Sequence, residues 1–297
     1  MSFALIQPLL LASALLWTSG FEAAAQGRHL RKHTVTEAAS LALEPATKML
    51  AKGRAVIKFS GRYRMITSNG IPTHRVGAFP NAGNPHKIKP QSHEFSVAYI
   101  PRKAFRTKNL GMDMLMGVAV NGIPLDPMAA EYYLGNRKGW QYNALGGALP
   151  LGLDANYAHV QPSGAYHYHG LPVGLMQELG WQAEKASPLI GYAADGFPIF
   201  AMTAKVDGKV KRMRSSYRLK PGNRPGGRKP SGPHDGSFIN DYEYVRGAGD
   251  LDACNGVEVT TPDYPNGVYA YFLTQKFPVV PRCLVGKIGK GFKKDRG

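Results

Sequence analysis

Cysteine is scarce in this chain of 297 residues. The two that are present, Cys254 and Cys283, do not form a C-x-x-C pair, which argues against a thiolate zinc site of the finger or ribbon type. The sequence also lacks a G-x-S-x-G element and a glycine-rich phosphate loop of the Walker or dinucleotide type, so nucleophilic serine chemistry and nucleotide binding have little support. Acidic residues are few as well, 20 against 37 Lys and Arg, and the formal net charge is +17.

Charge is almost absent from the first 25 residues, where Glu22 is the only charged side chain. An apolar run from Phe3 to Trp17, followed by three alanines that end at Ala25, is typical of a secretory signal peptide, and the run is too short to span a bilayer comfortably. We therefore expect a periplasmic or secreted protein with no transmembrane span after cleavage. An oxidising compartment would permit a disulfide between Cys254 and Cys283.

The positive charge is concentrated in two stretches. Residues 205–230 hold ten Lys and Arg against one acid, and residues 287–297 hold five against one. Their Gly- and Pro-rich composition is typical of an exposed loop or tail, which could attach the protein to an anionic surface or polysaccharide, or serve only solubility. No helix-turn-helix, zinc finger or aromatic RNA-binding motif accompanies the charge, so we expect no specific nucleic-acid partner.

Three of the nine histidines lie within the segment 159–170, which reads H-V-Q-P-S-G-A-Y-H-Y-H-G. Because side chains alternate across a strand, His167 and His169 would share one face and Tyr166 and Tyr168 the other. The intervening Q-P-S-G has turn chemistry, and closure of a hairpin between Val160 and Tyr166 would bring His159 opposite His167. Closure one residue earlier would point His159 away, and we favour the first register.

Two interpretations of this histidine group remain open. His159, His167 and His169 could hold a transition metal, with zinc or copper favoured by the imidazole ligands, and an open position on such a metal could activate water in a hydrolase or oxidase. Alternatively, the histidines and tyrosines could form a hydrogen-bonded core layer or line a polar ligand pocket. The sequence alone does not decide whether the protein is an enzyme.

The segment resembles the YHYH protein family, which takes its name from the tetrapeptide at 166–169. The likeness extends over roughly residues 90–285. It includes V-N-G-I-P from Val120, the central H-V-Q-P-S-G-A-Y-H-Y-H-G, P-L-I-G-Y-A-A-D-G-F-P-I-F from Pro188, S-Y-R-L-K from Ser216, D-Y-E-Y-V from Asp241, G-D-L-D-A-C-N-G from Gly249, Y-A-Y-F-L from Tyr269 and P-R-C from Pro281. The resemblance implies no particular reaction or catalytic residue.

Acidic residues elsewhere supply further candidates. Asp195, in a turn between apolar stretches, is either a turn cap or a functional group: a fourth metal ligand, a hydrogen-bond partner of an imidazole, or the base for a metal-bound water. Asp154 and Glu178 are weaker candidates of the same kind. Asp252 and Asn255 either form a turn held by the disulfide or join the ligand pocket with the two tyrosines of the motif.

The pattern of short apolar stretches and turns predicts a mostly β protein, an antiparallel sandwich or distorted barrel with a few short helices. We expect a signal peptide at 1–25, a polar and partly helical segment at 26–50, one β domain at 51–286 and a basic tail at 287–297. Strands are predicted at Ala55–Phe59, Tyr63–Thr67, Phe95–Ile100, Gly117–Val120, Leu189–Ala193, Ile199–Ala204, Tyr242–Val245 and Val268–Thr274, and helices at Thr36–Lys52 and Leu171–Leu179. His74, His86 and His93 lie in a Pro-, Gly- and Asn-rich loop that is typical of solvated surface.

Overall fold

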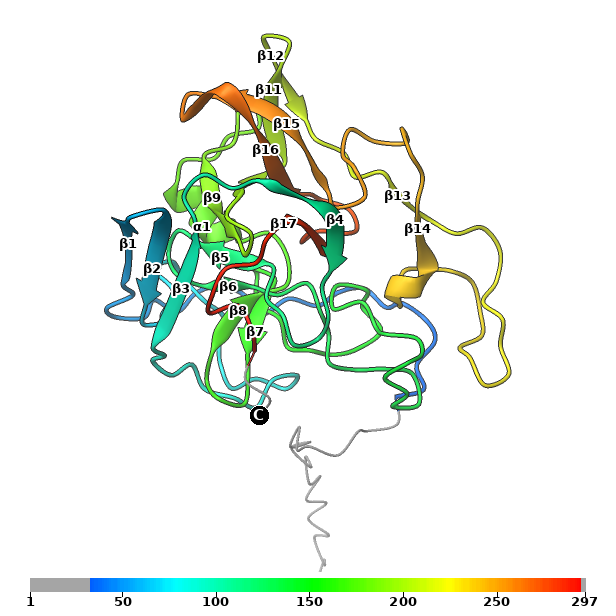
Figure 1. Ribbon diagram of the computed structural model, residues 1–297. Helices are drawn as coiled ribbons and strands as arrows, with labels where there is room; N and C mark the ends of the chain where they lie inside the picture. The colour runs from blue at the N-terminus through cyan, green and yellow to red at the C-terminus, as the bar shows by residue number, and fades with distance from the viewer. Residues whose placement is uncertain (1–32, 295–297) are drawn as a thin grey trace, which may run out of the picture.

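The computed structural model describes residues 33–294 and is mostly β, as the sequence predicts (Figure 1). The predicted signal peptide lies outside these residues. The strands are β1 Ala55–Ser60, β2 Tyr63–Ser68, β3 His93–Ala98, β4 Lys103–Asn109, β5 Gly117–Ala119, β6 Pro124–Leu125, β7 Ala158–Val160, β8 Tyr166–Tyr168, β9 Leu189–Ala193, β10 Pro198–Ala201, β11 Thr203–Val206, β12 Lys209–Arg212, β13 Tyr217–Leu219, β14 Tyr242–Tyr244, β15 Gly256–Thr261, β16 Tyr264–Leu273 and β17 Cys283–Gly286. The helical elements are α1 Val173–Glu178 and a single 3-10 turn, η1 Ile239–Asp241.

An open sheet of eight strands forms the centre, in the order β15-β16-β10-β9-β5-β6-β8-β7. The pairs β10–β16 and β6–β8 are parallel and the others antiparallel. Strands β5, β6, β8 and β10 are buried along their whole length, so their apolar side chains pack on both faces. The sheet does not close into a barrel, and the histidine hairpin β7–β8 lies at one edge.

Smaller sheets surround this centre: β1-β2-β3, β11-β12, β13-β14 and β17-β4. The segment after β17 also returns to the core. Phe292 is 1% exposed, its carbonyl accepts a hydrogen bond from the Leu115 amide, and Lys290 exchanges backbone hydrogen bonds with Ser96. Residues 287–294 are therefore packed against the domain, although Lys287, Lys290 and Lys293 keep exposed side chains. Within residues 33–294, no helix has the length and apolar character needed to cross a bilayer.

The predicted helix at Thr36–Lys52 does not form. This segment instead runs extended along the domain, where the Glu44 amide donates to the Leu153 carbonyl and Lys48 exchanges two backbone hydrogen bonds with Val76. Pro45 removes a donor in the middle of the stretch, and each bond to a neighbouring loop uses a backbone group that a helix would need. Tertiary pairing therefore prevails over a weak helical pattern.

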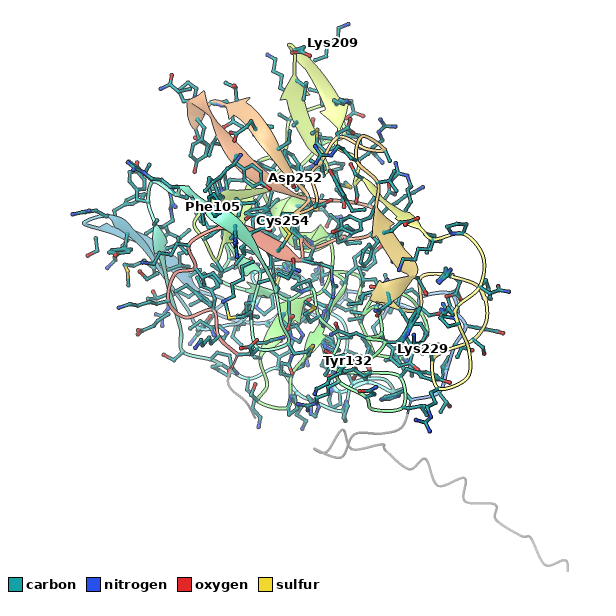
Figure 2. The ribbon with its side chains drawn as sticks, turned by 45° about the vertical axis from the view of Figure 1, so that its right-hand side comes forward. Phe105, Tyr132, Lys209, Lys229, Asp252 and Cys254 are labelled. Carbon is teal, nitrogen blue, oxygen red and sulfur yellow. A yellow bond between two sulfur atoms is a disulfide. The ribbon has the colours of Figure 1, made fainter. Side chains whose placement is uncertain are left out.

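The basic stretch 205–230 is only partly a free loop. Its first part forms the β11–β12 hairpin, which projects from the molecule with Lys209 at its tip (Figures 1 and 2). Lys211 and Arg214 both bind Asp250, and Arg224 is buried in ion pairs with Asp235 and Asp241. Some of the charge that favours an anionic partner is thus neutralised within the fold, and attachment through this loop stays a prediction.

A disulfide joins Cys254 to Cys283, which are 29 residues apart in sequence. We expect the Cys254→Ala/Cys283→Ala variant to lose about 3 to 4 kcal/mol of unfolding free energy, because the crosslink restricts the unfolded chain. Urea unfolding of the variant and the oxidised protein measures the difference. A reduced wild-type sample is the control and should match the variant. Equal midpoints for all three samples would contradict this role of the crosslink.

Candidate metal centre

The hairpin β7–β8 adopts the register that brings the histidines together. His159 pairs with His167 and Val160 with Tyr166, so the predicted closure is confirmed. The turn is closed by a hydrogen bond from the Gln161 amide to the Ala165 carbonyl, and by one from the Gly164 amide to the Gln161 carbonyl. Gly164 has a φ of 92° and lies so close to Lys89 that a Cβ would approach that side chain to 2.6 Å. Glycine is therefore required at this turn position.

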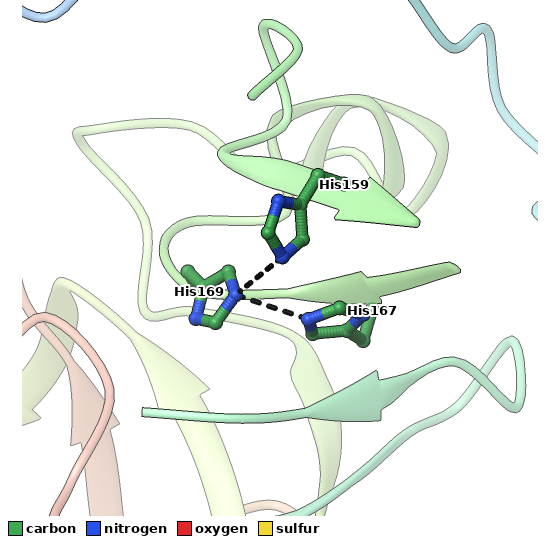
Figure 3. A group of neighbouring side chains, drawn as sticks. All are labelled: His159, His167 and His169. Carbon is green, nitrogen blue, oxygen red and sulfur yellow. Dashed lines mark hydrogen bonds between the residues drawn. The ribbon is translucent and has the colours of Figure 1, made fainter. Parts of the chain in front are cut away.

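The three imidazoles converge through their Nε2 atoms, as Figure 3 shows. The Nε2 of His169 lies 3.0 Å from the Nε2 of His167 and 3.1 Å from the Nε2 of His159. These residues form a group whose possible ligand atoms all lie within 4.8 Å of one another, so the cluster can hold a metal ion. In a tetrahedral zinc site with Zn–N bonds of about 2.0 to 2.1 Å, ligand nitrogens are separated by about 3.3 Å, which is close to the observed spacing.

The opposite ring nitrogens of two of these histidines face backbone carbonyls. Nδ1 of His159 donates to the Leu151 carbonyl at 2.9 Å, and Nδ1 of His167 lies 3.3 Å from the Ala165 carbonyl. A carbonyl oxygen only accepts hydrogen bonds, so the proton of each neutral ring belongs on Nδ1 and the lone pair on Nε2. Both lone pairs then point at the Nε2 of His169.

Hydrogen bonds alone cannot satisfy this arrangement. The Nε2 of His169 carries either one proton or one lone pair, so it can donate to one neighbour at most. At least one of the two short Nε2 contacts would then join two lone pairs at about 3 Å. A shared cation removes the conflict, because all three lone pairs can bind it.

Burial keeps the three imidazoles neutral. It lowers the pKa of His159 to about 3, with a further contribution from nearby His167. Burial also lowers the pKa of His167, and it places the pKa of His169 well below the usual value, with His167 and His159 adding to the effect. Neutral imidazole is the form that ligates a metal.

These shifts predict a pH dependence of the metal-free protein. Between pH 6.5 and about 3 the unfolded chain binds protons that the folded histidines do not, so stability should fall as pH falls through this window. The slope should reach up to about 1.4 kcal/mol per pH unit for each histidine. Urea unfolding in EDTA at pH 5 and pH 7 measures it.

The variant His159→Asn should have a shallower slope than the wild type, because one titrating group is removed. The same slope in His159→Asn and wild type would contradict the assignment of the buried protons.

Asp126 and Lys294 form a buried ion pair beside the cluster that the sequence did not suggest. Their Nζ–Oδ2 distance is 2.6 Å, and the Asp126 side chain is 1% exposed. Burial lowers the pKa of His167, the nearby Asp126 charge opposes this, and Lys294 lowers the pKa further. The Asp126 amide also donates to the Tyr168 carbonyl, which ties this carboxylate to the motif strand. The two residues are 168 positions apart, so no local pattern links them.

Both motif tyrosines face away from the histidines and bind a separate polar network. The Tyr166 hydroxyl donates to Asp154 at 2.7 Å, and the Tyr168 hydroxyl contacts His74 Nε2 at 2.5 Å. Asn121 donates to the same Tyr168 oxygen at 3.0 Å. His74 is 2% exposed, so its expected place on solvated surface is wrong. These contacts give no support to the predicted pocket role of the tyrosines. They are typical of a core layer in which every hydroxyl has a hydrogen-bond partner.

The structure does not bring Asp195 to the histidines. Its carboxylate accepts hydrogen bonds from the Tyr271 hydroxyl at 2.6 Å and from the Gly286 amide at 2.8 Å. Burial raises the pKa of Asp195, and these two bonds oppose the rise. Asp195 is absent from the metal-ligand group, and its contacts join the β9–β10 turn to β16 and β17. A turn and packing role accounts for each of them.

Asp252 and Asn255 likewise serve the turn next to the disulfide. Asp252 accepts from the amides of Cys254 and Gly256 and from the Tyr269 hydroxyl. The Asn255 side chain is fully buried and donates to the backbone of β16 and of the loop after it. Neither residue belongs to the histidine group.

The fold and the cluster define a mostly β protein with three imidazoles, two of them buried and one half-buried, in a geometry suited to a metal ion. By sequence the chain belongs to the YHYH family, since the family model described as YHYH protein matches residues 94–286. The matched region contains the whole histidine hairpin. Neither the curated proteins nor the solved structures that were compared give a match to this chain.

Proposed function

We propose that this protein binds one transition-metal ion through the Nε2 atoms of His159, His167 and His169. The observation that carries the proposal is the convergence of the three Nε2 atoms, two of them with lone pairs fixed by bonds from Nδ1. Zinc and copper are the favoured metals, because imidazole is a borderline ligand that suits both, and no carboxylate joins the group to favour calcium or magnesium.

Three protein ligands leave room for a fourth. The Gln161 side-chain amide lies beside the cluster, with its Nε2 3.3 Å from the Nε2 of His167. Amide nitrogen and oxygen are nearly interchangeable in shape, so a half-turn of the amide would present a carbonyl oxygen to the ion. A solvent molecule could occupy the same position. Because Asp195 lies elsewhere, we propose binding and assign no reaction.

The disulfide supports a location outside the reducing cytosol. Structural disulfides persist in the periplasm and the extracellular space, where metal ions also encounter exported proteins. We propose that the mature protein is periplasmic or secreted and acquires its metal there. Determining the N-terminal residue of the protein recovered from the periplasm or the medium tests this part, with cleavage near Ala25 as the expected result.

Metal analysis of the purified protein is the direct test of the site. The protein should be prepared without chelator and without an affinity metal, then examined by elemental analysis. We expect close to one zinc or copper per chain. Replacing the ion by Co²⁺ should give the visible absorption of a site with about four ligands. A metal-free protein that also fails to take up zinc, copper or cobalt in solution would refute the proposal.

A further inference from the structure

Large apolar side chains are exposed on the β1–β2 hairpin and on the segment that leads from β3 into β4. The three most exposed large hydrophobic residues of the described chain are Phe105 at 97%, Ile100 at 73% and Phe59 at 64%. Tyr63 and Tyr99 are exposed by 55% and 48%. All five belong to the β1–β2 hairpin or to the stretch from the end of β3 into β4 (Figures 1 and 2). Isolated exposed apolar residues are ordinary, but a cluster of this kind marks an interaction surface.

Direct contacts hold part of this cluster in place. The rings of Phe59 and Tyr99 pack edge to face with centroids 4.9 Å apart, and the Tyr99 amide bonds to the Arg62 carbonyl. Beneath them lies Arg64, which is 3% exposed and stacks 3.7 Å from the centre of the Tyr192 ring. The apolar side chains are therefore presented on a packed base.

Basic residues surround the apolar ones. Residues 54–64 and 99–109 contain no acid and eight Lys or Arg. Lys103 pairs with Glu258, but several of the other bases are exposed and form no ion pair within residues 33–294, among them Lys58, Arg62, Arg102, Arg106 and Lys108. We call the five apolar and five basic residues together the apolar–basic surface.

We propose that the apolar–basic surface docks on an anionic lipid membrane, with Phe59, Ile100 and Phe105 entering the headgroup region. Aromatic and aliphatic side chains lower their free energy on leaving water, and unpaired Lys and Arg are attracted to anionic headgroups. A second copy of this chain fits the surface less well, because face-to-face association would oppose five bases to five bases. This inference does not depend on the metal site.

Charge and exposure also separate this surface from the basic stretch 205–230. That stretch uses Lys211, Arg214 and Arg224 in ion pairs, and its exposed apolar residues, Val210 and Leu219, are only 40% and 44% exposed. The two regions therefore provide matched variants for one experiment. Co-sedimentation of the purified protein with vesicles of phosphatidylcholine, with and without phosphatidylglycerol, is the measurement.

We expect the wild type to bind the anionic vesicles, and to bind them more weakly at high salt. Phe59→Ser/Phe105→Ser should weaken binding by at least about tenfold without unfolding the protein, because both side chains are mostly exposed to solvent. Neutralising four of the bases together should weaken vesicle binding to a similar extent, in the variant Lys58→Gln/Arg62→Gln/Arg102→Gln/Arg106→Gln. The control Val210→Ser/Leu219→Ser should bind as the wild type does, and circular dichroism should show all of them folded.

Four results would overturn the proposal. The first two are an absence of binding to anionic vesicles and equal binding to neutral vesicles. The third is wild-type binding by both variants of the apolar–basic surface. The fourth is that neutralising the bases of the 205–230 stretch abolishes binding while the apolar–basic surface is intact, with Lys205, Lys209, Arg228 and Lys229 replaced by Gln. A concentration-dependent dimer that Phe59→Ser/Phe105→Ser abolishes, without vesicle binding, would assign the surface to self-association and would also overturn the proposal.

Discussion

The variant His169→Ala should lose metal binding, with affinity for zinc or copper falling by more than about 100-fold. His169 is the central residue of the proposed site, because its Nε2 lies within about 3.1 Å of both other Nε2 atoms. Loss of an outer-shell partner alone commonly costs about 10- to 100-fold in affinity, and removal of a ligand costs more. Competition titration against a chelator of known affinity measures the change.

Two controls make the metal prediction specific. His234→Ala changes a half-buried histidine outside the cluster, whose Nδ1 faces the carbonyls of Pro221 and Gly222, so the metal affinity of this variant should equal that of the wild type. His74→Gln alters the tyrosine network, and it should lower stability while keeping the metal. If His169→Ala still bound one metal ion per chain with wild-type affinity, the histidine cluster would not be the metal site.

The variant Asp154→Ala should lose about 3 to 5 kcal/mol of unfolding free energy, the largest stability effect that we expect. The Asp154 carboxylate is fully buried and accepts bonds from the Tyr166 hydroxyl and from the amides of Gly77 and Asn156. Each buried donor left without a partner costs about 1 to 3 kcal/mol. Urea unfolding followed by tryptophan fluorescence measures the loss.

Tyr166→Phe is the graded control for the same network. It removes one hydroxyl and leaves the other donors to Asp154 in place, so we expect a loss of about 1 to 2 kcal/mol. Both variants should bind metal as the wild type does when folded, because their side chains occupy the face opposite the histidines. An Asp154→Ala protein of unchanged stability that no longer bound metal would reverse this assignment of the two faces.

Short apolar runs bounded by turn residues made much of the sheet predictable. Leu189–Ala193 was predicted with the bounds that the structure has, and of the two hairpin registers that the turn residues 161–164 allowed, the favoured one is observed. The stretch Ile199–Ala204 was predicted as one strand, but Met202 has a φ of 60° and divides it into β10 and β11. Left-handed backbone at a methionine leaves no signal in an apolar pattern.

Contacts between residues that are distant in sequence could not be predicted from the sequence. His74 meets Tyr168 across 94 positions, and its loop composition indicated surface. The ion pair of Asp126 with Lys294 depends on the return of residues 287–294 to the core, whereas their basic composition suggested a free tail. Asp195 was a reasonable candidate by residue type, but its position relative to the histidines depends on how β9, β10 and β17 assemble.

The alternation of the motif also has an evolutionary consequence. Each of its two faces can change by substitution without disturbing the other, so a lineage could lose the imidazoles and keep the Tyr166–Asp154 layer, or the reverse. An insertion or deletion of a single residue between Val160 and Tyr166 would exchange the two faces and damage both at once. Variation within this segment should therefore be confined to replacements at constant length, even though turns are ordinarily where chains gain and lose residues.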